Sequence, residues 1–276
     1  MKLSRTRLLQ EMGIGPVWRL RGAPAGDENE GANASGAPAA GSTVTASEAA
    51  SEAAAVRRPP AVAAGPVAPV DTAAVAAMDW PTLRRTIAEC TACGLCRERK
   101  QAVPGVGDEN ADWLFIGEGP GAEEDARGEP FVGQAGKLLD AMLAAIDLKR
   151  GNDVYIANAV KCRPPGNRTP EAGEMAACRP YLQRQIALLR PKLIVLLGRA
   201  ALQAVLNEER PLGASRGQLF EYRDGDLAIP VIATYHPAYL LRNLPDKAKA
   251  WEDLCFARRT MRTQQAAGAA LPRSGD

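Results

Sequence analysis

The stretch "DWLFIGEGPGAEEDARGEPFVGQAGKLLDAMLAAI" (residues 112–146) contains the pattern from which the fold is predicted. It begins with a short apolar run typical of a buried strand, continues through a glycine-rich loop, and ends in a helical pattern from Ala135 to Ile146. Three later apolar runs have the same character as the first: "DVYIANAV" (153–160), "KLIVLLG" (192–198) and "IPVIATY" (229–235).

Helical patterns alternate with these runs, over residues 171–189 and 200–206. Alternating strands and helices predict an α/β fold, a three-layer α/β/α sandwich with a mainly parallel central sheet of about four strands. The segment "GQLFEYRDGDLAIPVI" (217–232) predicts a hairpin that turns at Asp224–Gly225 before the last strand.

The chain of 276 residues divides by composition into four parts. Residues 1–22 are basic and carry apolar side chains, which makes them a possible docking peptide. Residues 23–77 are rich in Ala, Pro, Gly and Ser and contain no Leu, Ile, Met, Cys or aromatic residue, so we expect a disordered linker. We predict a folded domain over residues 78–264 and a flexible tail over residues 265–276.

Charge and hydropathy disfavour several classes of protein. The formal net charge is +2, so no basic field covers the whole chain, and any contact with DNA must come from a local surface. No apolar stretch reaches the roughly 18 residues of a membrane span, and the amino end lacks the apolar core of a signal peptide. We therefore expect a monomeric cytoplasmic protein with no membrane partner.

The glycine-rich loop contains "GEGPGA" (117–122), which fits the G-x-G-x-x-A pattern of dinucleotide sites. Such a site needs a helix to begin at once, whereas about a dozen residues intervene here, including Pro130. The loop also holds carboxylates that would repel a diphosphate: Glu118, Glu123, Glu124, Asp125 and Glu129. The loop is better suited to a flat, nearly neutral ligand pressed against the backbone, on which Phe131 could stack.

Ligands of such folds bind beyond the carboxyl ends of the parallel strands. Those ends carry Glu118 and Gly119 after the first run, Asn158 within the second, and His236 after the last. We therefore expect these residues to converge on one site.

Two separated pairs of cysteines indicate a metal or cluster site: Cys90 with Cys93, and Cys162 with Cys178. Cys96 extends the first pair to C-x2-C-x2-C, but Lys100 stands where a ferredoxin run would place its fourth ligand. The spacing does not choose between tetrahedral zinc and a [4Fe–4S] cluster, and the thiols could also simply be buried. We interpret Cys96 and Cys255 as residues outside any such site.

Four motifs of the domain resemble those of the family 4 uracil-DNA glycosylases, the iron–sulfur branch of the uracil glycosylase superfamily. They are "CTAC" (90–93), "GEGPGAEEDARGEPFVGQAGKLLD" (117–140), "NAVKCRPPGNRTP" (158–170) and "HPAYLLRN" (236–243). The resemblance implies a uracil-DNA glycosylase-like fold and favours a [4Fe–4S] cluster over zinc. The cluster ligands would be Cys90, Cys93, Cys162 and Cys178, and in this family the cluster is thought to hold the loops that grip DNA.

The resemblance also names the ligand of the glycine-rich loop, a uracil base flipped out of the duplex. Phe131 would stack on its face. Asn158 would donate to O4 and accept from N3–H, which distinguishes uracil from cytosine. Glu124 would lie near C5 and help to exclude the methyl group of thymine.

Catalysis is expected from the residues on the O2 side of the base. His236, the only histidine, would donate a hydrogen bond to O2, where negative charge develops as the C1′–N1 bond breaks. Glu118 and the backbone N–H of Gly119 would line this side and the attacking water. Many members of the superfamily carry Asp or Asn where Gly119 stands, so Glu118 is the candidate for positioning the water.

Contacts with DNA are expected from two segments. The first offers apolar and cationic side chains, namely Tyr239, Leu240, Leu241 and Arg242, and the second, "CRPPGNR", offers Arg163 and Arg168. No lysine is evident as a Schiff-base nucleophile, so we expect a monofunctional glycosylase that leaves an abasic site. The alternative is a non-catalytic iron–sulfur protein that binds DNA or transfers electrons.

The amino-terminal segment "LLQEMGIGPVWRLR" (8–21) is apolar and basic. It loosely resembles the peptide by which the psi subunit of bacterial DNA polymerase III attaches to the clamp loader, with Trp18 as the anchor. We hypothesise that residues 1–22 bind a replisome or clamp-loader protein.

Overall fold

The computed structural model describes residues 70–270. The predicted docking peptide (1–22), most of the predicted linker and the end of the predicted tail lie outside these residues. None of the helices within residues 70–270 is both long and apolar enough to cross a membrane.

A single six-stranded sheet forms the centre of the domain, in the order β1-β3-β2-β4-β6-β5. Its strands are β1 (Val106–Gly107), β2 (Trp113–Gly117), β3 (Val154–Asn158), β4 (Leu193–Leu197), β5 (Leu219–Asp224) and β6 (Leu227–Thr234). The four inner strands β3, β2, β4 and β6 are parallel, and β1 and β5 add antiparallel edges. The prediction of a mainly parallel sheet is confirmed, and the sheet is larger than predicted because both edges carry an additional strand.

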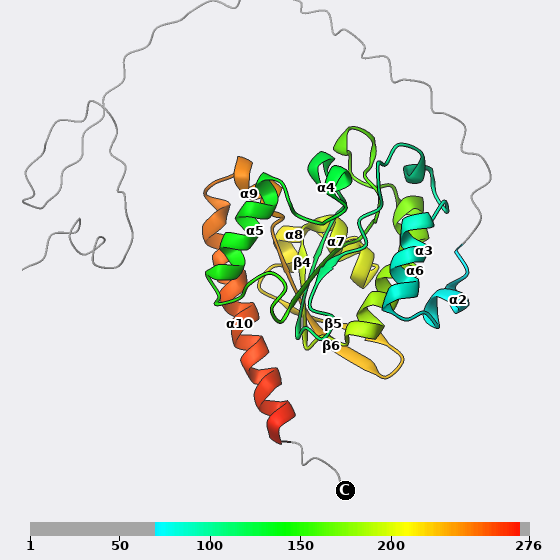
Figure 1. Ribbon diagram of the computed structural model, residues 1–276. Helices are drawn as coiled ribbons and strands as arrows, with labels where there is room; N and C mark the ends of the chain where they lie inside the picture. Colours follow the sequence, from blue (N-terminus) through cyan, green and yellow to red (C-terminus); the bar gives the residue numbers. More distant parts are fainter. Residues whose placement is uncertain (1–69, 271–276) are drawn as a thin grey trace, which may run out of the picture. The chain divides into compact units, whose positions relative to one another are not determined.

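Helices cover both faces of the sheet, as Figure 1 shows. On one face lie α5 (Gln134–Ala144), α9 (Pro237–Arg242) and α10 (Asp246–Ala270), and on the other lie α6 (Ala172–Leu189) and α7 (Arg199–Leu206). α2 (Thr72–Ala76) and α3 (Trp80–Glu89) pack on the outside of α6. The short helices are η1 (Gly94–Arg97), α4 (Ala122–Arg127), η2 (Pro165–Asn167) and α8 (Leu212–Ser215).

The alternation of side chains along the buried strands divides the core into two layers. In β2, Leu114 and Ile116 belong to the cluster that includes α6 and α7, whereas Trp113 and Phe115 belong to the cluster that includes α5 and α10. Successive residues of a strand point to opposite faces, so a continuous apolar run is what a sheet covered on both sides requires. The three-layer α/β/α prediction is confirmed.

The ends of the folded part differ from the predicted residues 78–264. α2 lies within the range predicted as linker, and its Val75 is buried against α3 and α6. Asp71 caps α2, because its carboxylate accepts hydrogen bonds from the N–H groups of Ala73 and Ala74. At the other end, α10 continues to Ala270. A single buried valine within an alanine-rich stretch gives too weak a pattern to predict a helix.

Candidate active site

The carboxyl ends of the parallel strands meet at one edge of the sheet, where the predicted site residues converge. Gly117 and Asn158 are register partners at the ends of β2 and β3, and His236 follows β6. A cavity of about 490 Å³ opens at this edge. All six residues predicted to bind the base or to act in catalysis line this cavity, namely Glu118, Gly119, Glu124, Phe131, Asn158 and His236.

Asn158 brings a buried acceptor to this cavity. Its side chain is 2% exposed, and its Oδ1 has no hydrogen-bond partner among the described residues. Burying an acceptor without a partner costs free energy, so such an atom at a cavity wall indicates a ligand that donates a hydrogen bond. The neighbouring strand leaves room for this amide only because Gly117 has no side chain, since a Cβ there would lie 2.5 Å from Oδ1.

His236 caps the amino end of α9. Its Nδ1 accepts a hydrogen bond of 3.1 Å from the backbone N–H of Ala238. A neutral imidazole with an accepting Nδ1 carries its proton on Nε2, which is then a donor. The pKa of His236 is lowered to about 4, first by burial and second by the nearby charge of Arg242, while Glu124 acts in the opposite direction. The imidazole is therefore a neutral donor at pH 7.

Phe131 forms an apolar wall of the cavity. The side chain is buried, and its ring centroid lies 5.4 Å from that of the His236 imidazole, with 31° between the planes. A Cβ at Gly117 would also lie 2.5 Å from Cζ of Phe131. The absence of a side chain at Gly117 therefore accommodates both the aromatic wall and the Asn158 amide.

The two carboxylates of the cavity have different surroundings. Oε1 of Glu124 accepts hydrogen bonds from the N–H groups of Val132 (2.9 Å) and Gly133 (3.0 Å), and Oε2 accepts from Gly121 (3.1 Å). Glu124 therefore ties the two halves of the glycine-rich loop together. Burial raises the pKa of Glu118, and a hydrogen bond with Thr169 opposes this rise. Thr169 also lines the cavity, although it was not among the site residues predicted from the sequence.

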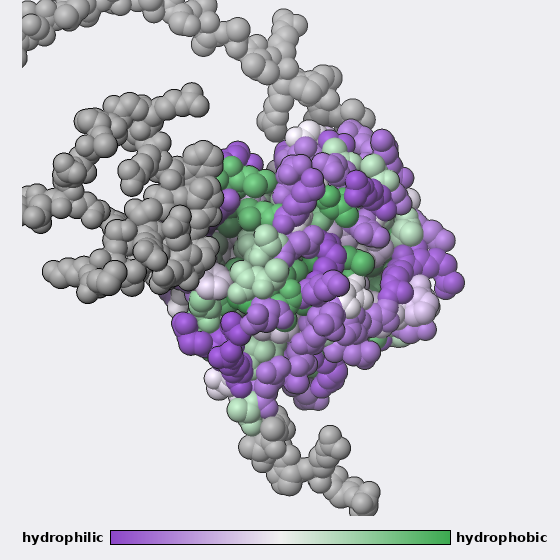
Figure 2. Space-filling view, turned by 60° about the vertical axis from the view of Figure 1, so that its left-hand side comes forward, coloured by the Kyte–Doolittle hydropathy of each residue, from purple (hydrophilic) through white to green (hydrophobic). Residues whose placement is uncertain are grey.

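The residues predicted to contact DNA differ in their exposure. Tyr239, Arg242 and Arg168 line the cavity, and Leu241 is 41% exposed. Leu240 is 1% exposed and packs in the core beneath α9, so its prediction as a DNA contact is corrected by its burial. Figure 2, which brings the α5, α9 and α10 side forward, shows apolar surface among mainly polar surface. Leu244, which the sequence analysis did not select, is 60% exposed just after α9.

The two arginines of the loop after β3 are held by neighbours. Nε of Arg163 donates to Oδ1 of Asn167 (2.8 Å). The guanidinium of Arg168 donates to both carboxylate oxygens of Glu174, at 2.8 and 2.7 Å. Arg242, in contrast, forms no ion pair within residues 70–270. Arg242 is thus the cavity cation whose charge is left for an outside partner.

The four cysteines of the two predicted pairs line one small cavity, which is distinct from the cavity at the strand ends. Cys96, which was interpreted from the sequence as lying outside any such site, lines the same cavity. The C-x2-C-x2-C spacing is the sequence feature that indicates its position near Cys90 and Cys93. Among the described residues, no group of three or more His, Cys, Asp or Glu side chains is arranged as ligands of one metal ion. The thiols are therefore gathered at one place without closing around a single ion.

The surroundings of Cys162 and Cys178 stabilise the protonated form of these two thiols. Burial raises the pKa of Cys162 to about 11 and that of Cys178 to about 12. Nη1 of Arg99 donates to Sγ of Cys162 (2.8 Å), which opposes this effect. The buried ammonium of Lys161 lines the same cavity and donates to the backbone carbonyl of Asn158 (2.8 Å) and to the side chain of Gln185 (2.6 Å). A sulfur-ligated group would have to displace the thiol protons, and these cations would compensate the resulting charge.

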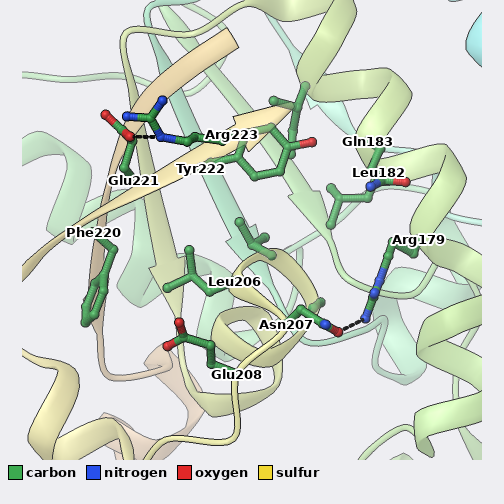
Figure 3. A pocket seen from close by; sticks show the side chains of 13 residues that line it. Arg179, Leu182, Gln183, Leu206, Asn207, Glu208, Phe220, Glu221, Tyr222 and Arg223 are labelled. Carbon is green, nitrogen blue, oxygen red and sulfur yellow. Dashed lines mark hydrogen bonds and ion pairs between the residues drawn. The ribbon is translucent and has the colours of Figure 1, made fainter. Parts of the chain in front are cut away.

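A second cavity, of about 380 Å³, lies between α6, α7 and β5 (Figure 3). Some of its polar groups pair with one another, since Arg179 donates to Asn207 (2.8 Å) and Arg223 forms an ion pair with Glu221, whereas Nε of Arg179 is buried without a hydrogen-bond partner among the described residues. It contains none of the predicted site residues. The convergence of the predicted residues therefore favours the cavity at the strand ends as the candidate site.

Comparisons with known proteins give matches to one superfamily. Residues 104–255 match the family described as the uracil DNA glycosylase superfamily. The chain is 47% identical over 161 residues to the type-4 uracil-DNA glycosylase of Archaeoglobus fulgidus, covering 57% of this chain and 80% of that protein. It is 41% identical over 183 residues to the type-4 uracil-DNA glycosylase of Pyrobaculum aerophilum, covering 65% and 93%, respectively. It is 45% identical over 158 residues to that of Thermotoga maritima, covering 57% and 80%.

Proposed function

Because the chain belongs to the uracil DNA glycosylase superfamily, we propose that it removes uracil from DNA by hydrolysing the N-glycosidic bond, the first step of base excision repair. The observation that carries the proposal is the unpartnered Oδ1 of Asn158, buried on the wall of the cavity that also holds Phe131 and His236. The product is an abasic site, and the described residues that line the cavity include no lysine to form a Schiff base.

Asn158 selects uracil by the polarity of its hydrogen bonds. Oδ1 accepts the N3–H of uracil, and Nδ2 donates to O4. Cytosine presents an acceptor at N3 and a donor at C4, so it leaves the buried amide unpaired, at a cost of about 1–3 kcal/mol. Phe131 stacks on the base, which fixes the edge that faces Asn158.

His236 and the residues after β2 act on the bond that breaks. As the C1′–N1 bond lengthens, negative charge develops on uracil, largely at O2. The neutral imidazole donates from Nε2 to this oxygen, a hydrogen bond that strengthens in the transition state. One preorganised donor of this kind typically gives ~10²–10³ in rate. Glu118 and the N–H of Gly119 line the same cavity as His236 and position the attacking water.

Four cysteines, Cys90, Cys93, Cys162 and Cys178, hold a [4Fe–4S] cluster in this proposal. Support comes from their position around one cavity and from the similarity to type-4 enzymes. A cluster held by these cysteines would link α6, the loop after β3 and the segment that precedes η1. That loop continues into Arg168 and Thr169 of the active-site wall, so the cluster fixes one side of the cavity.

The DNA surface consists of the cavity rim and α9. Leu241 and Tyr239 offer side chains that can replace the extruded base in the stack, and Arg242 meets a phosphate. Arg168 in the cavity lining and Arg163 in the same loop provide further positive charge. Because few cations take part, binding should weaken only moderately with added salt.

The remaining parts of the proposal concern residues outside the described range and the setting of the enzyme. Residues 1–22 serve as a docking peptide for a replisome or clamp-loader protein, and the enzyme acts as a monomer. A cytoplasmic location suits both a DNA substrate and a set of reduced cysteines.

The test is excision from a uracil-containing oligonucleotide, followed by alkali and gel electrophoresis. The wild-type protein should convert the strand to an alkali-labile product, and oligonucleotides with cytosine or thymine at the same position should remain intact. A protein that carries the cluster and binds DNA but releases no uracil would overturn the proposal in favour of a non-catalytic iron–sulfur protein.

A further inference from the structure

Phe131 has a backbone conformation that is unfavourable for its residue type. Its φ is +55°, in the left-handed region, where glycine, asparagine and aspartate are the usual residues. The other non-glycine residues with positive φ in the described part of the chain are Asp, Asn or Arg. Phe131 is thus the aromatic residue among them, and it lines the proposed uracil pocket. A strained residue of this kind persists only where its surroundings hold it.

Arg150 holds the two peptide groups on either side of Phe131. Nη1 donates to the carbonyl oxygen of Pro130 (2.8 Å), and Nη2 donates to that of Phe131 (2.8 Å). The peptide group before a residue sets its φ, and the one after it sets its ψ, so this guanidinium constrains both angles. Nε of Arg150 donates in turn to Asp140 on α5 (3.0 Å), which orients the guanidinium.

Glu124 completes the restraint from the other side. The peptide group that joins Phe131 to Val132 donates its N–H to Oε1 of Glu124 (2.9 Å), while its carbonyl accepts from Arg150. The backbone of α5 also lies close, since a Cβ at Gly136 would be 1.8 Å from the Phe131 carbonyl oxygen. A guanidinium, a carboxylate and a helix backbone therefore fix one peptide group.

We propose that Arg150 is a positioning residue for base recognition, which holds Phe131 in its left-handed conformation so that the ring forms the stacking wall of the uracil pocket. The inference rests on the proposed function, and it assigns a role to a residue outside the cavity lining and outside the four sequence motifs. Arginine is required because its planar fork reaches two carbonyl oxygens at once, whereas lysine offers a single point charge.

A double-mutant cycle tests the inference. Arg150→Ala should lower the single-turnover rate of uracil excision by about 10²-fold, the cost of misplacing a substrate-positioning group. In a Phe131→Ala background, the same substitution should cost less than about threefold, because the ring through which Arg150 acts is already missing. An equal loss in both backgrounds would overturn the proposal, since it would mean that Arg150 acts on the fold as a whole.

Matched variants guard against a trivial loss of folding. Arg258→Ala removes another arginine paired with an aspartate on the same side of the domain, Asp147, and should leave the rate within about twofold. If Arg150→Ala does not fold, the cycle is repeated with Arg150→Lys, for which the same non-additivity with Phe131→Ala is expected and additivity refutes the role. An inactive wild-type enzyme would refute the proposed function itself, whereas an active wild type with an additive cycle refutes only the role of Arg150.

Discussion

Gly117 and Asn158 face each other as register partners at the ends of two neighbouring parallel strands, and Oδ1 of Asn158 occupies the space that a side chain at Gly117 would need. A Cβ there would lie 2.5 Å from Oδ1 and 2.5 Å from the ring of Phe131. The same missing side chain thus permits both the polar and the apolar contact of the pocket with the base.

Gly117→Ala should therefore displace both groups that recognise the base. Because a misplacement of about 1 Å can cost 10²-fold, we expect the single-turnover excision rate to fall by about that factor. The matched control is Gly173→Ala on α6, where a Cβ meets no atom within 4 Å, and it should retain the wild-type rate. A Gly117→Ala enzyme with unchanged rate and unchanged discrimination against cytosine would contradict the arrangement described.

His236 gives a prediction about pH. Its pKa in the folded protein is lowered to about 4, so the imidazole stays neutral, with a donating Nε2, as the pH falls from 8 towards 5. The rate of excision should show no inflection near the ordinary histidine value of about 6.5. A bell-shaped or sigmoid profile with a midpoint near that value, lost in a His236→Gln variant, would show that the imidazolium is the active form.

Stability should follow the same titration. The unfolded chain binds a proton at His236 below pH 6.5, whereas the folded chain resists protonation until about pH 4, so the unfolded state binds more protons in this window. The contribution of this residue to stability is therefore present above pH 6.5 and is lost as the pH falls through the window. Chemical denaturation at pH 7 and pH 5 should show a larger loss for the wild type than for His236→Gln.

The cysteines lead to a prediction about metal content. Cys162→Ser and Cys178→Ser should each lose most of the bound iron and the visible absorption of an iron–sulfur cluster, and their melting temperatures should fall because cluster binding is coupled to folding. Cys255→Ser on α10, outside the cysteine cavity, is the control and should retain all three properties. Cys96→Ser should also retain iron if only four thiols are ligands. Stoichiometric zinc in the wild type, without visible absorption, would refute the cluster.

Much of the fold follows from the sequence because the four buried strands are apolar runs separated by helical patterns. The convergence of Asn158 and His236 then follows from topology, since parallel strands end at one edge. β1 could not be predicted, because a two-residue strand carries no periodic pattern. The hairpin at Asp224–Gly225 predicts that β5 pairs with β6. It does not predict that β5 is the edge strand, which depends on packing elsewhere in the sheet.

The site was less predictable where function depends on contacts between distant segments. No motif in the sequence around Arg150 indicates that its side chain contacts the backbone on both sides of Phe131. Glu124 could be assigned to the pocket by its motif. Its three hydrogen bonds to loop N–H groups could not be predicted, because they depend on how the loop folds back on itself. The proton position on His236 likewise depends on the N–H of Ala238, which becomes available only because α9 begins there.

Leu240 and Leu241 are adjacent in one motif, yet they should behave oppositely when replaced by alanine. Leu240 is 1% exposed in the core beneath α9, so Leu240→Ala should lower the free energy of unfolding by about 2–5 kcal/mol. Leu241 is 41% exposed, so Leu241→Ala should change the free energy of unfolding by less than about 0.5 kcal/mol.

The effect of Leu241 on excision should depend on the substrate. An apolar wedge can take the place of an extruded base only where the neighbouring bases are stacked, so Leu241→Ala should slow excision from duplex DNA more than from a single strand. Urea denaturation and single-turnover assays on both substrates measure these effects. Equal slowing of Leu241→Ala on the two substrates would remove this leucine from the role of wedge and leave Leu244 as the exposed apolar side chain to test next.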